Sequence, residues 1–395
     1  MLKIANLSIY FKGIRRICLI VFFGGFIFTD LYPYPLRAQV QDVYLVTNIA
    51  VDRTAKTAAK ARQKAINDGH KRAFVGLMDR LVPESQRDQI PNIQRSEINF
   101  LIRSFGIDEE RRSTVRYLGK LRFEFSRSEV RRFLKKWGVN FAETRSKPLL
   151  LLPVYKRAGA TLLWDKPNPW FAAWRSGPVM DGLRPLRLPA GDLSDIRDIS
   201  AAKALAGDAG QLRHIAERYG ASGVVVALAS LTNNIGSGER SIVTVLKYFG
   251  NASRDSTTFQ SFDFSEDEVI NSALSRVANN LSRQIVENWK RANLIQFDRL
   301  NTLIAEVALT HIREWVKMRA RLRRIAFLKD YQILSVSRGK VLVKLLFYGD
   351  PSQLKIALEQ RDIEIKRGIK NWILRDLKEA KVVPANRQPD EGIQR

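Results

Sequence analysis

The pattern of apolar and polar positions predicts three successive modules, of which the N-terminal module spans residues 39–147. Alanine and leucine recur at helical spacing along one long segment, while shorter segments alternate as strands do. The resulting order is β-α-β-β-α. We place these elements at Val43–Val51, Thr54–Leu81 (with Thr54 as the helix cap), Ile98–Ile107, Thr114–Phe125 and a last helix that starts at Ser126 or Ser128 and ends at Trp137.

The central module, residues 148–292, alternates strands with helices. Its first segment, Leu149–Tyr155, is a continuous apolar run, which is typical of a strand buried on both faces. Two capping boxes, Asp208 with Gln211 and Ser265 with Glu268, predict helix starts. We expect a three-layer α/β arrangement with a mixed sheet. Its other strands are predicted at Arg184–Pro189, Gly223–Leu231, Ile242–Phe249 and Thr257–Phe264.

The C-terminal module, residues 293–378, shows the β-α-β-β-α-β order of ferredoxin-like folds. The fold class is therefore α+β / α/β, with two ferredoxin-like βαββα modules flanking the three-layer module. Residues 379–395 are polar and are expected to be a disordered tail. The elements of the module are predicted at Leu303–Leu309, Ile312–Ile325, Tyr331–Val336, Lys340–Tyr348, Pro351–Gln360 and Ile363–Lys366.

The first 38 residues have the pattern of an export signal. A basic start precedes the apolar run Ile17–Phe28, which is shorter than the roughly 20 residues that span a bilayer. Cleavage near Ala38 would give a periplasmic protein; an uncleaved N-terminal membrane anchor is the alternative. The lone cysteine, Cys18, lies inside this leader, so the mature chain would suit an oxidising compartment.

Charge is unevenly distributed over the 395 residues. Lys and Arg number 66 against 40 Asp and Glu, a net charge of +26. Residues 39–147 hold 23 basic and 13 acidic residues (+10), residues 148–292 hold 17 and 14 (+3), and residues 293–395 hold 21 and 12 (+9). This distribution indicates that the outer modules face an anionic envelope component or an acidic protein partner. Peripheral membrane contact fits this pattern.

Catalytic motifs are absent from the sequence. Its three histidines fall one in each module and read as solvated or capping residues, and neither a P-loop nor a G-x-S-x-G motif occurs. We therefore expect no enzyme activity, no metal and no cofactor. The remaining acids, Asp192, Asp195 and Asp198, read best as helix-start charges. The alternative is an envelope-polymer hydrolase that uses acids near Asp165 or Asp192.

Two segments are candidates for binding. The first holds Trp164, Asp165, Asn168, Trp170 and Trp174, where rigid aromatics beside polar groups could contact a partner or ligand, or could instead cover the sheet as core. The second is a basic helix face for an anionic surface, which could instead be a solvated outer face. Its four residues lie away from the apolar face of the helix in this interpretation, so replacing them should leave the fold intact. They are Arg313, Lys317, Arg321 and Arg324, opposite Ile312, Trp315, Val316 and Leu322.

Several segments in order resemble a bacterial envelope family of unknown function, numbered 2066. They are LLLLPVY, LWDKPNPWFAAW, RYGASGVVVA and FYGDPSQLKIAL, and the resemblance spans most of residues 40–375. The resemblance implies a location in the cell envelope and the three-module architecture. It implies no mechanism, because the family has no assigned activity. Taken together, the sequence predicts an exported, non-enzymatic binding or scaffolding protein. Nucleic acid is not an expected partner, because an export signal takes the chain away from it.

Overall fold

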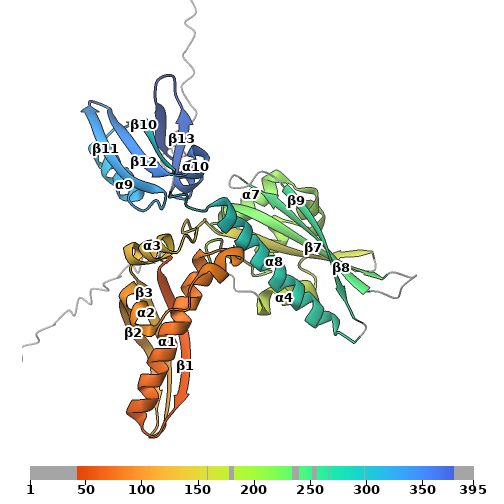
Figure 1. Ribbon diagram of the computed structural model, residues 1–395. Helices are drawn as coiled ribbons and strands as arrows, with labels where there is room; N and C mark the ends of the chain where they lie inside the picture. The colour runs from red at the N-terminus through yellow and green to blue at the C-terminus, as the bar shows by residue number, and fades with distance from the viewer. Residues whose placement is uncertain are drawn as a thin grey trace, which may run out of the picture. The chain divides into compact units, whose positions relative to one another are not determined.

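Three β-sheets of three, six and five strands organise this mixed α+β protein (Figure 1). The computed structural model describes residues 42–157, 159–177, 182–233, 240–250, 256–265, 267–297 and 299–377. The predicted leader and cleavage position and the predicted tail lie outside the described residues. Residues from Asp42 onward form one unit.

The N-terminal module packs one long helix on a three-stranded sheet of order β1-β3-β2. Helix α1 lies against β1 and β3, and Gly69 permits the close approach, since a Cβ there would lie 2.6 Å from Leu121 Cδ1. Thr57, rather than Thr54, caps α1, because β1 continues to Thr54. The elements are β1 (Leu45–Thr54), α1 (Ala58–Leu81), the 3-10 helix η1 (Glu84–Gln89), α2 (Arg95–Leu101), β2 (Ile102–Arg112), β3 (Arg116–Phe125) and α3 (Arg127–Lys136).

Helices cover both faces of the six-stranded sheet in the central module. The sheet order is β5-β4-β7-β8-β9, with β6 beside β4. Helices α4 and α8 pack on one face, and α6 and α7 on the other. Its elements are β4 (Leu149–Arg157), β5 (Ala160–Leu162), α4 (Pro169–Ser176), β6 (Leu186–Arg187), α5 (Leu193–Asp198), α6 (Ala201–Ala206), α7 (Ala209–Arg218), β7 (Gly223–Asn233), β8 (Arg240–Phe249), β9 (Ser256–Phe264) and α8 (Ile270–Ala292).

One predicted helix start in this module was wrong. Helix α8 begins at Ile270 with Val269 as its N-cap, so Ser265 and Glu268 do not form the expected capping box. Glu268 pairs instead with Arg276, Oε2 to Nη2 at 2.9 Å. The Glu268 carboxylate therefore binds a side chain of α8 instead of capping the N-terminus of that helix. The box at Asp208 was predicted more accurately, because Asp208 caps α7 and accepts from the Gln211 N–H.

The C-terminal module has five strands in the order β11-β12-β10-β14-β13. Strand β14 was not predicted; it pairs in parallel with β10 and antiparallel with β13, and it separates the two. Helix α9 supplies buried Trp315, Met318 and Leu322 to the core. The elements are β10 (Leu300–Ala308), α9 (Ile312–Leu322), β11 (Leu328–Ser337), β12 (Lys340–Tyr348), α10 (Pro351–Glu359), β13 (Ile363–Arg367) and β14 (Trp372–Asp376).

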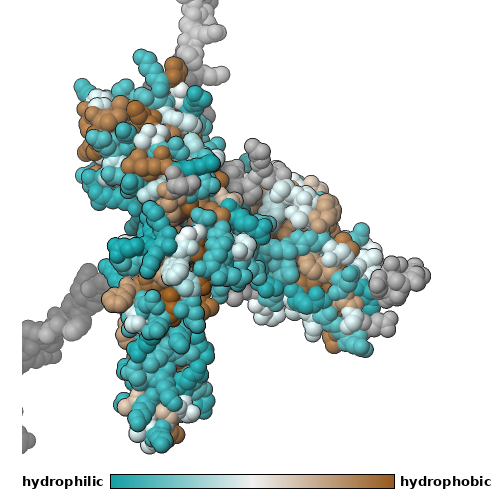
Figure 2. Space-filling model, in the orientation of Figure 1, coloured by the Kyte–Doolittle hydropathy of each residue, from teal (hydrophilic) through white to brown (hydrophobic). Residues whose placement is uncertain are grey.

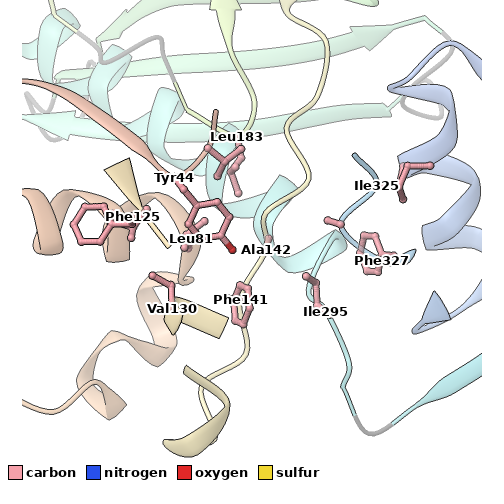
Figure 3. Close-up of a cluster of buried hydrophobic side chains, with 14 of the residues drawn as sticks. Tyr44, Leu81, Phe125, Val130, Phe141, Ala142, Leu183, Ile295, Ile325 and Phe327 are labelled. Carbon is pink, nitrogen blue, oxygen red and sulfur yellow. The ribbon is translucent and has the colours of Figure 1, made fainter. Parts of the chain in front are cut away.

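A segment without regular structure, residues 139–148, carries much of the contact between these elements. Figure 3 shows its Phe141 and Ala142 among side chains from α1, α3 and the start of the C-terminal module. The Ala142 N–H donates to Leu81 O at 2.9 Å, and the Ile295 N–H donates to Phe141 O at 2.9 Å. One core cluster therefore continues from the N-terminal module through this segment into the C-terminal module.

Candidate functional site

The aromatic segment of the central module is mostly core. Trp170 and Trp174 are fully buried, with ring centroids 5.5 Å apart, and they pack beneath α8. The Trp170 Nε1–H donates to Ala227 O at 2.8 Å. Neither indole offers surface to a partner, which agrees with the core alternative for these two residues.

The other three residues of this segment shape the turn before α4. Asn168 caps α4 by accepting from the Phe171 N–H at 3.0 Å, and its Nδ2 donates to Leu163 O at 3.2 Å. Trp164 is half-buried and donates from Nε1 to Ile199 O at 2.7 Å. Asp165 alone among the five candidates is exposed. A binding role here would fall on Asp165 and the open side of Trp164.

Of the three acids at α5, Asp192 caps the helix, and Asp195 and Asp198 hold it against α7. Asp192 caps α5 by accepting from the Asp195 N–H at 3.0 Å. The Asp195 carboxylate is fully buried and accepts from Arg218, from the Tyr219 hydroxyl at 2.9 Å and from the Gly191 N–H at 2.7 Å. Asp198 accepts from Arg218 Nε at 2.7 Å. These contacts join α5 to α7.

The same contacts set the protonation of Asp195. Burial by itself would raise the pKa of this carboxyl, but the hydrogen bonds from Arg218, Gly191 and Tyr219 outweigh burial and lower it. Asp195 is therefore a stable anion with all its partners in place. A general acid or base needs a carboxylate oxygen that is free to exchange a proton with a substrate, whereas both oxygens of Asp195 already accept hydrogen bonds within the protein.

The exposed side of α9 joins an apolar edge strand. Ile312 and Val316 are 62% and 51% exposed, although the sequence placed them on the buried face with Trp315 and Leu322. Arg313 and Lys317 are exposed beside them. Trp315 touches Tyr331 of β11, with ring centroids 6.2 Å apart, so α9 and β11 adjoin.

Strand β11 adds two exposed apolar side chains, Ile333 and Val336, to this region. Ile333 and Val336 pair with Val343 and Val341, which are buried beneath the helices, so the pair lies on the helix-covered face of the sheet. Figure 2 shows hydrophobic residues gathered where Figure 1 places α9 and β11. We call this region the α9–β11 surface. It comprises Ile312, Val316, Ile333 and Val336 with Arg313 and Lys317, whereas Arg324 lies beyond the end of α9 at Leu322.

Arg321 differs from the other three predicted cations of α9. Its guanidinium pairs with Asp376 of β14 and donates to Asp362 O at 3.3 Å. The residue is half-buried, whereas Arg313, Lys317 and Arg324 are exposed. These contacts give a reason to expect that Arg321, unlike the other three, is not replaceable without cost to the fold. It lies about 80° around the helix from the first of them, toward β14.

The three histidines differ in burial, and each lies in a different module. His214 and His311 are exposed, as predicted, but His70 is buried against Phe123, with ring centroids 5.0 Å apart. Burial lowers the pKa of His70, and nearby Arg95 adds to the effect. No group of three metal-ligand side chains occurs among the described residues. No helix within the described ranges is long and apolar enough to cross a membrane.

A cavity that the sequence did not predict lies in the N-terminal module. It has a volume of about 320 Å³ and opens between α1 and the segment from η1 to α2. The sequence held one weak signal, because Val75 is an apolar residue outside the buried stripe of α1. The other wall, near Ile90 and Ile93, comes from a stretch with no periodic pattern.

Comparisons with known proteins add little. No known family model matches the sequence, and no curated protein matches it. Formyltetrahydrofolate deformylase from Burkholderia mallei is similar at 12% identity with a TM-score of 0.18, covering 60% of this chain and 92% of that chain. At this TM-score the likeness carries no argument about fold or activity. The resemblance to the envelope family remains a hypothesis based on the sequence segments.

Proposed function

We propose that this chain is an exported, non-enzymatic protein of the bacterial envelope that docks on an anionic lipid surface. The observation that carries the proposal is the α9–β11 surface, where exposed apolar side chains stand beside exposed cations. Such a combination is typical of interfacial helices, whose apolar residues enter the headgroup region while Lys and Arg meet anionic lipids. Contiguous exposed apolar residues also mark interaction sites in soluble proteins.

The energetic argument supports weak, salt-sensitive binding. Each Lys or Arg held near an anionic bilayer contributes about 1 kcal/mol, and burial of a Val or Ile side chain contributes about 1.5–3 kcal/mol. Loss of motional freedom on binding opposes these gains. The ionic part is screened over about 8 Å at physiological salt, so it should fall steeply as salt rises.

The proposal also includes the fold of each module and the cellular location of the chain. Apart from η1 and α2, which are inserted before β2, both outer modules contain the β-α-β-β-α order, and helices lie on both faces of the central sheet. These observations support two ferredoxin-like modules flanking a three-layer module. The leader pattern supports a periplasmic location after cleavage near Ala38. The form of the hydrolase alternative that uses acids near Asp192 has less support, because Asp192 and Asp195 are occupied as a helix cap and a buried ion pair.

The test is co-sedimentation with vesicles of phosphatidylglycerol or of phosphatidylcholine across a salt series. The double variant Arg313→Gln with Lys317→Gln should lower partition onto anionic vesicles about tenfold to thirtyfold, the factor for about 2 kcal/mol. Ile312→Gln with Val316→Gln should lower it at all salt concentrations. Neutral vesicles should bind the wild-type chain poorly.

The opposite face of the same sheet offers matched controls. Ile304 and Lys344 are exposed and paired across β10 and β12, and their neighbours Leu303 and Leu345 point to the core. Ile304→Gln with Lys344→Gln removes one apolar and one charged residue but should leave binding unchanged. Equal loss in the control and α9 variants, or equal binding to both vesicle types, would refute the α9–β11 surface as the docking site.

A further inference from the structure

The cavity of the N-terminal module has an apolar floor and a polar rim. Phe74, Met78, Ile93 and Ile98 are buried at the floor, whereas Lys71, Asp79 and Asn92 are exposed. Pockets that bind small molecules share this division, with few polar groups fixing the orientation of a mostly apolar ligand. The complete lining is Lys71, Phe74, Val75, Met78, Asp79, Arg87, Ile90, Pro91, Asn92, Ile93 and Ile98.

The charges at the rim favour an anion. Arg87 is already neutralised, since its Nη1 lies 2.9 Å from Asp79 Oδ1 and its Nη2 lies 3.4 Å from Glu287 Oε1. Lys71 has no ion pair or hydrogen-bond partner within the described ranges. An unpaired ammonium beside an apolar cavity attracts a ligand that carries a negative head group.

The cavity wall is held in place before any ligand arrives. The Glu84 N–H donates to Glu287 Oε2 at 3.0 Å, which fixes the start of η1 on α8. The Asn140 N–H donates to Gln86 Oε1 at 2.9 Å and ties the middle of η1 to the connecting segment. A preformed cavity spares the ligand the cost of ordering its site.

The size of the cavity indicates whether its ligand is a single side chain of a partner protein or a longer apolar chain. A cavity of roughly 150 Å³ already holds benzene, so about 320 Å³ exceeds one aromatic side chain. At roughly 30 Å³ for each water-sized group, about ten methylene-sized groups fill it. We infer that the cavity binds the chain of a single-chain amphiphile of about ten carbons, with its anionic head group at Lys71.

Calorimetric titration of the full chain with octanoate and decanoate, below their micelle concentrations, tests this inference. Two added methylenes should tighten binding roughly fifteenfold, the factor for about 0.8 kcal/mol each. Dodecanoate should gain less than this, because the cavity is then full. Absence of binding by wild-type chain at millimolar decanoate would overturn the inference.

Two pairs of matched variants locate the site. Val75→Asp places a carboxylate in the cavity and should lower decanoate affinity at least tenfold, whereas Val115→Asp, at a similarly exposed valine outside it (49% against 56%), should not. Lys71→Gln should weaken decanoate up to about fivefold but leave decanol unchanged, and Lys64→Gln on the same helix should change neither. Equal effects within either pair would contradict the assignment.

The inference does not depend on the proposed binding to vesicles. The results of the two experiments together show which of the two proposals fails. Loss of decanoate binding in Val75→Asp with normal vesicle sedimentation supports a separate small-molecule site. Loss of both together would overturn a separate site and place the cavity at the membrane contact. Vesicle binding without any decanoate binding would refute the cavity inference alone.

Discussion

At the residue scale, the least predictable feature is the fully buried side chain of Glu143. The Tyr44 hydroxyl donates to it, and Arg131 donates to both of its oxygens. Arg131 also donates to Ala326 O at 2.9 Å. A buried carboxylate is tolerated only when its partners are all present, so these residues form one unit. Sequence spacing gives no sign of it, because the partners lie 12 to 195 positions apart.

Removal of the Glu143 charge should destabilise the protein strongly. Glu143→Gln leaves the Arg131 guanidinium without its anion, and broken buried pairs cost about 3 kcal/mol or more of unfolding free energy. Urea denaturation followed by circular dichroism measures this loss. Glu109→Gln is the control, because the exposed pair of Glu109 with Lys120 should contribute less than about 1 kcal/mol. Similar losses in the two variants would show that Glu143 is not effectively buried.

Alkaline pH should weaken the same unit. Burial first, and then the neighbouring Glu143 carboxylate, raise the pKa of Tyr44 well above its usual value near 10. The folded protein therefore keeps this proton while the unfolded chain loses it, and stability falls as pH rises above 10. Tyr44→Phe lacks this titration. Its unfolding free energy should decline less steeply than that of wild type above pH 10, and parallel curves would contradict the assignment.

At the element scale, the long helices were predictable from periodicity, but their buried faces were not always so. The expected strand Ile98–Ile107 was wrong at its start, because residues up to Leu101 belong to helix α2 and the strand begins at Ile102. Periodicity located α9, yet Ile312 and Val316 were assigned to the core with Trp315. In the structure the core uses Trp315, Met318 and Leu322 at i, i+3 and i+7, and the sequence contains both stripes. Strand β14 escaped prediction for a different reason. It is five residues long, and its parallel partner β10 is about 70 residues earlier.

The cations of α9 should therefore differ in their effect on stability. Arg321→Gln removes the pair with Asp376 and should cost about 2 kcal/mol, in the range for hydrogen bonds to charged groups. Arg313→Gln, at an exposed position, should change stability by less than about 0.5 kcal/mol. Thermal unfolding of both variants gives the comparison. Equal melting temperatures would mean that the Arg321 pair adds nothing to the fold.

At the scale of the whole molecule, the structure has three sheets in the order of the three expected modules, but the sequence did not indicate how the sheets connect. Residues 139–148 have no periodic pattern, and the expected boundary after residue 147 falls within them. In the structure this segment is largely buried. The Lys147 N–H donates to Gln360 Oε1 at 2.6 Å, and Thr144 O accepts from the Trp289 Nε1–H at 2.7 Å. Contacts of this kind depend on residues more than a hundred positions away, which local patterns cannot indicate.

The continuous core predicts that one side chain controls two modules. Phe141 is fully buried, and its ring lies 5.5 Å from that of Phe297. Phe141→Ala should cost about 3–5 kcal/mol because it empties the core where the modules join. Amide hydrogen exchange should then lose protection in both β3 and β12.

Phe347→Ala is the comparison, because Phe347 is equally buried but lies wholly within the C-terminal module. The loss of this ring should reduce protection in β12 far more than in β3, because Phe347 itself belongs to β12. Strand β3 is connected to that part of the core only through residues 139–148. If Phe141→Ala also affects one module alone, then the modules open independently. Residues 139–148 would in that case be a buried tether rather than a shared core.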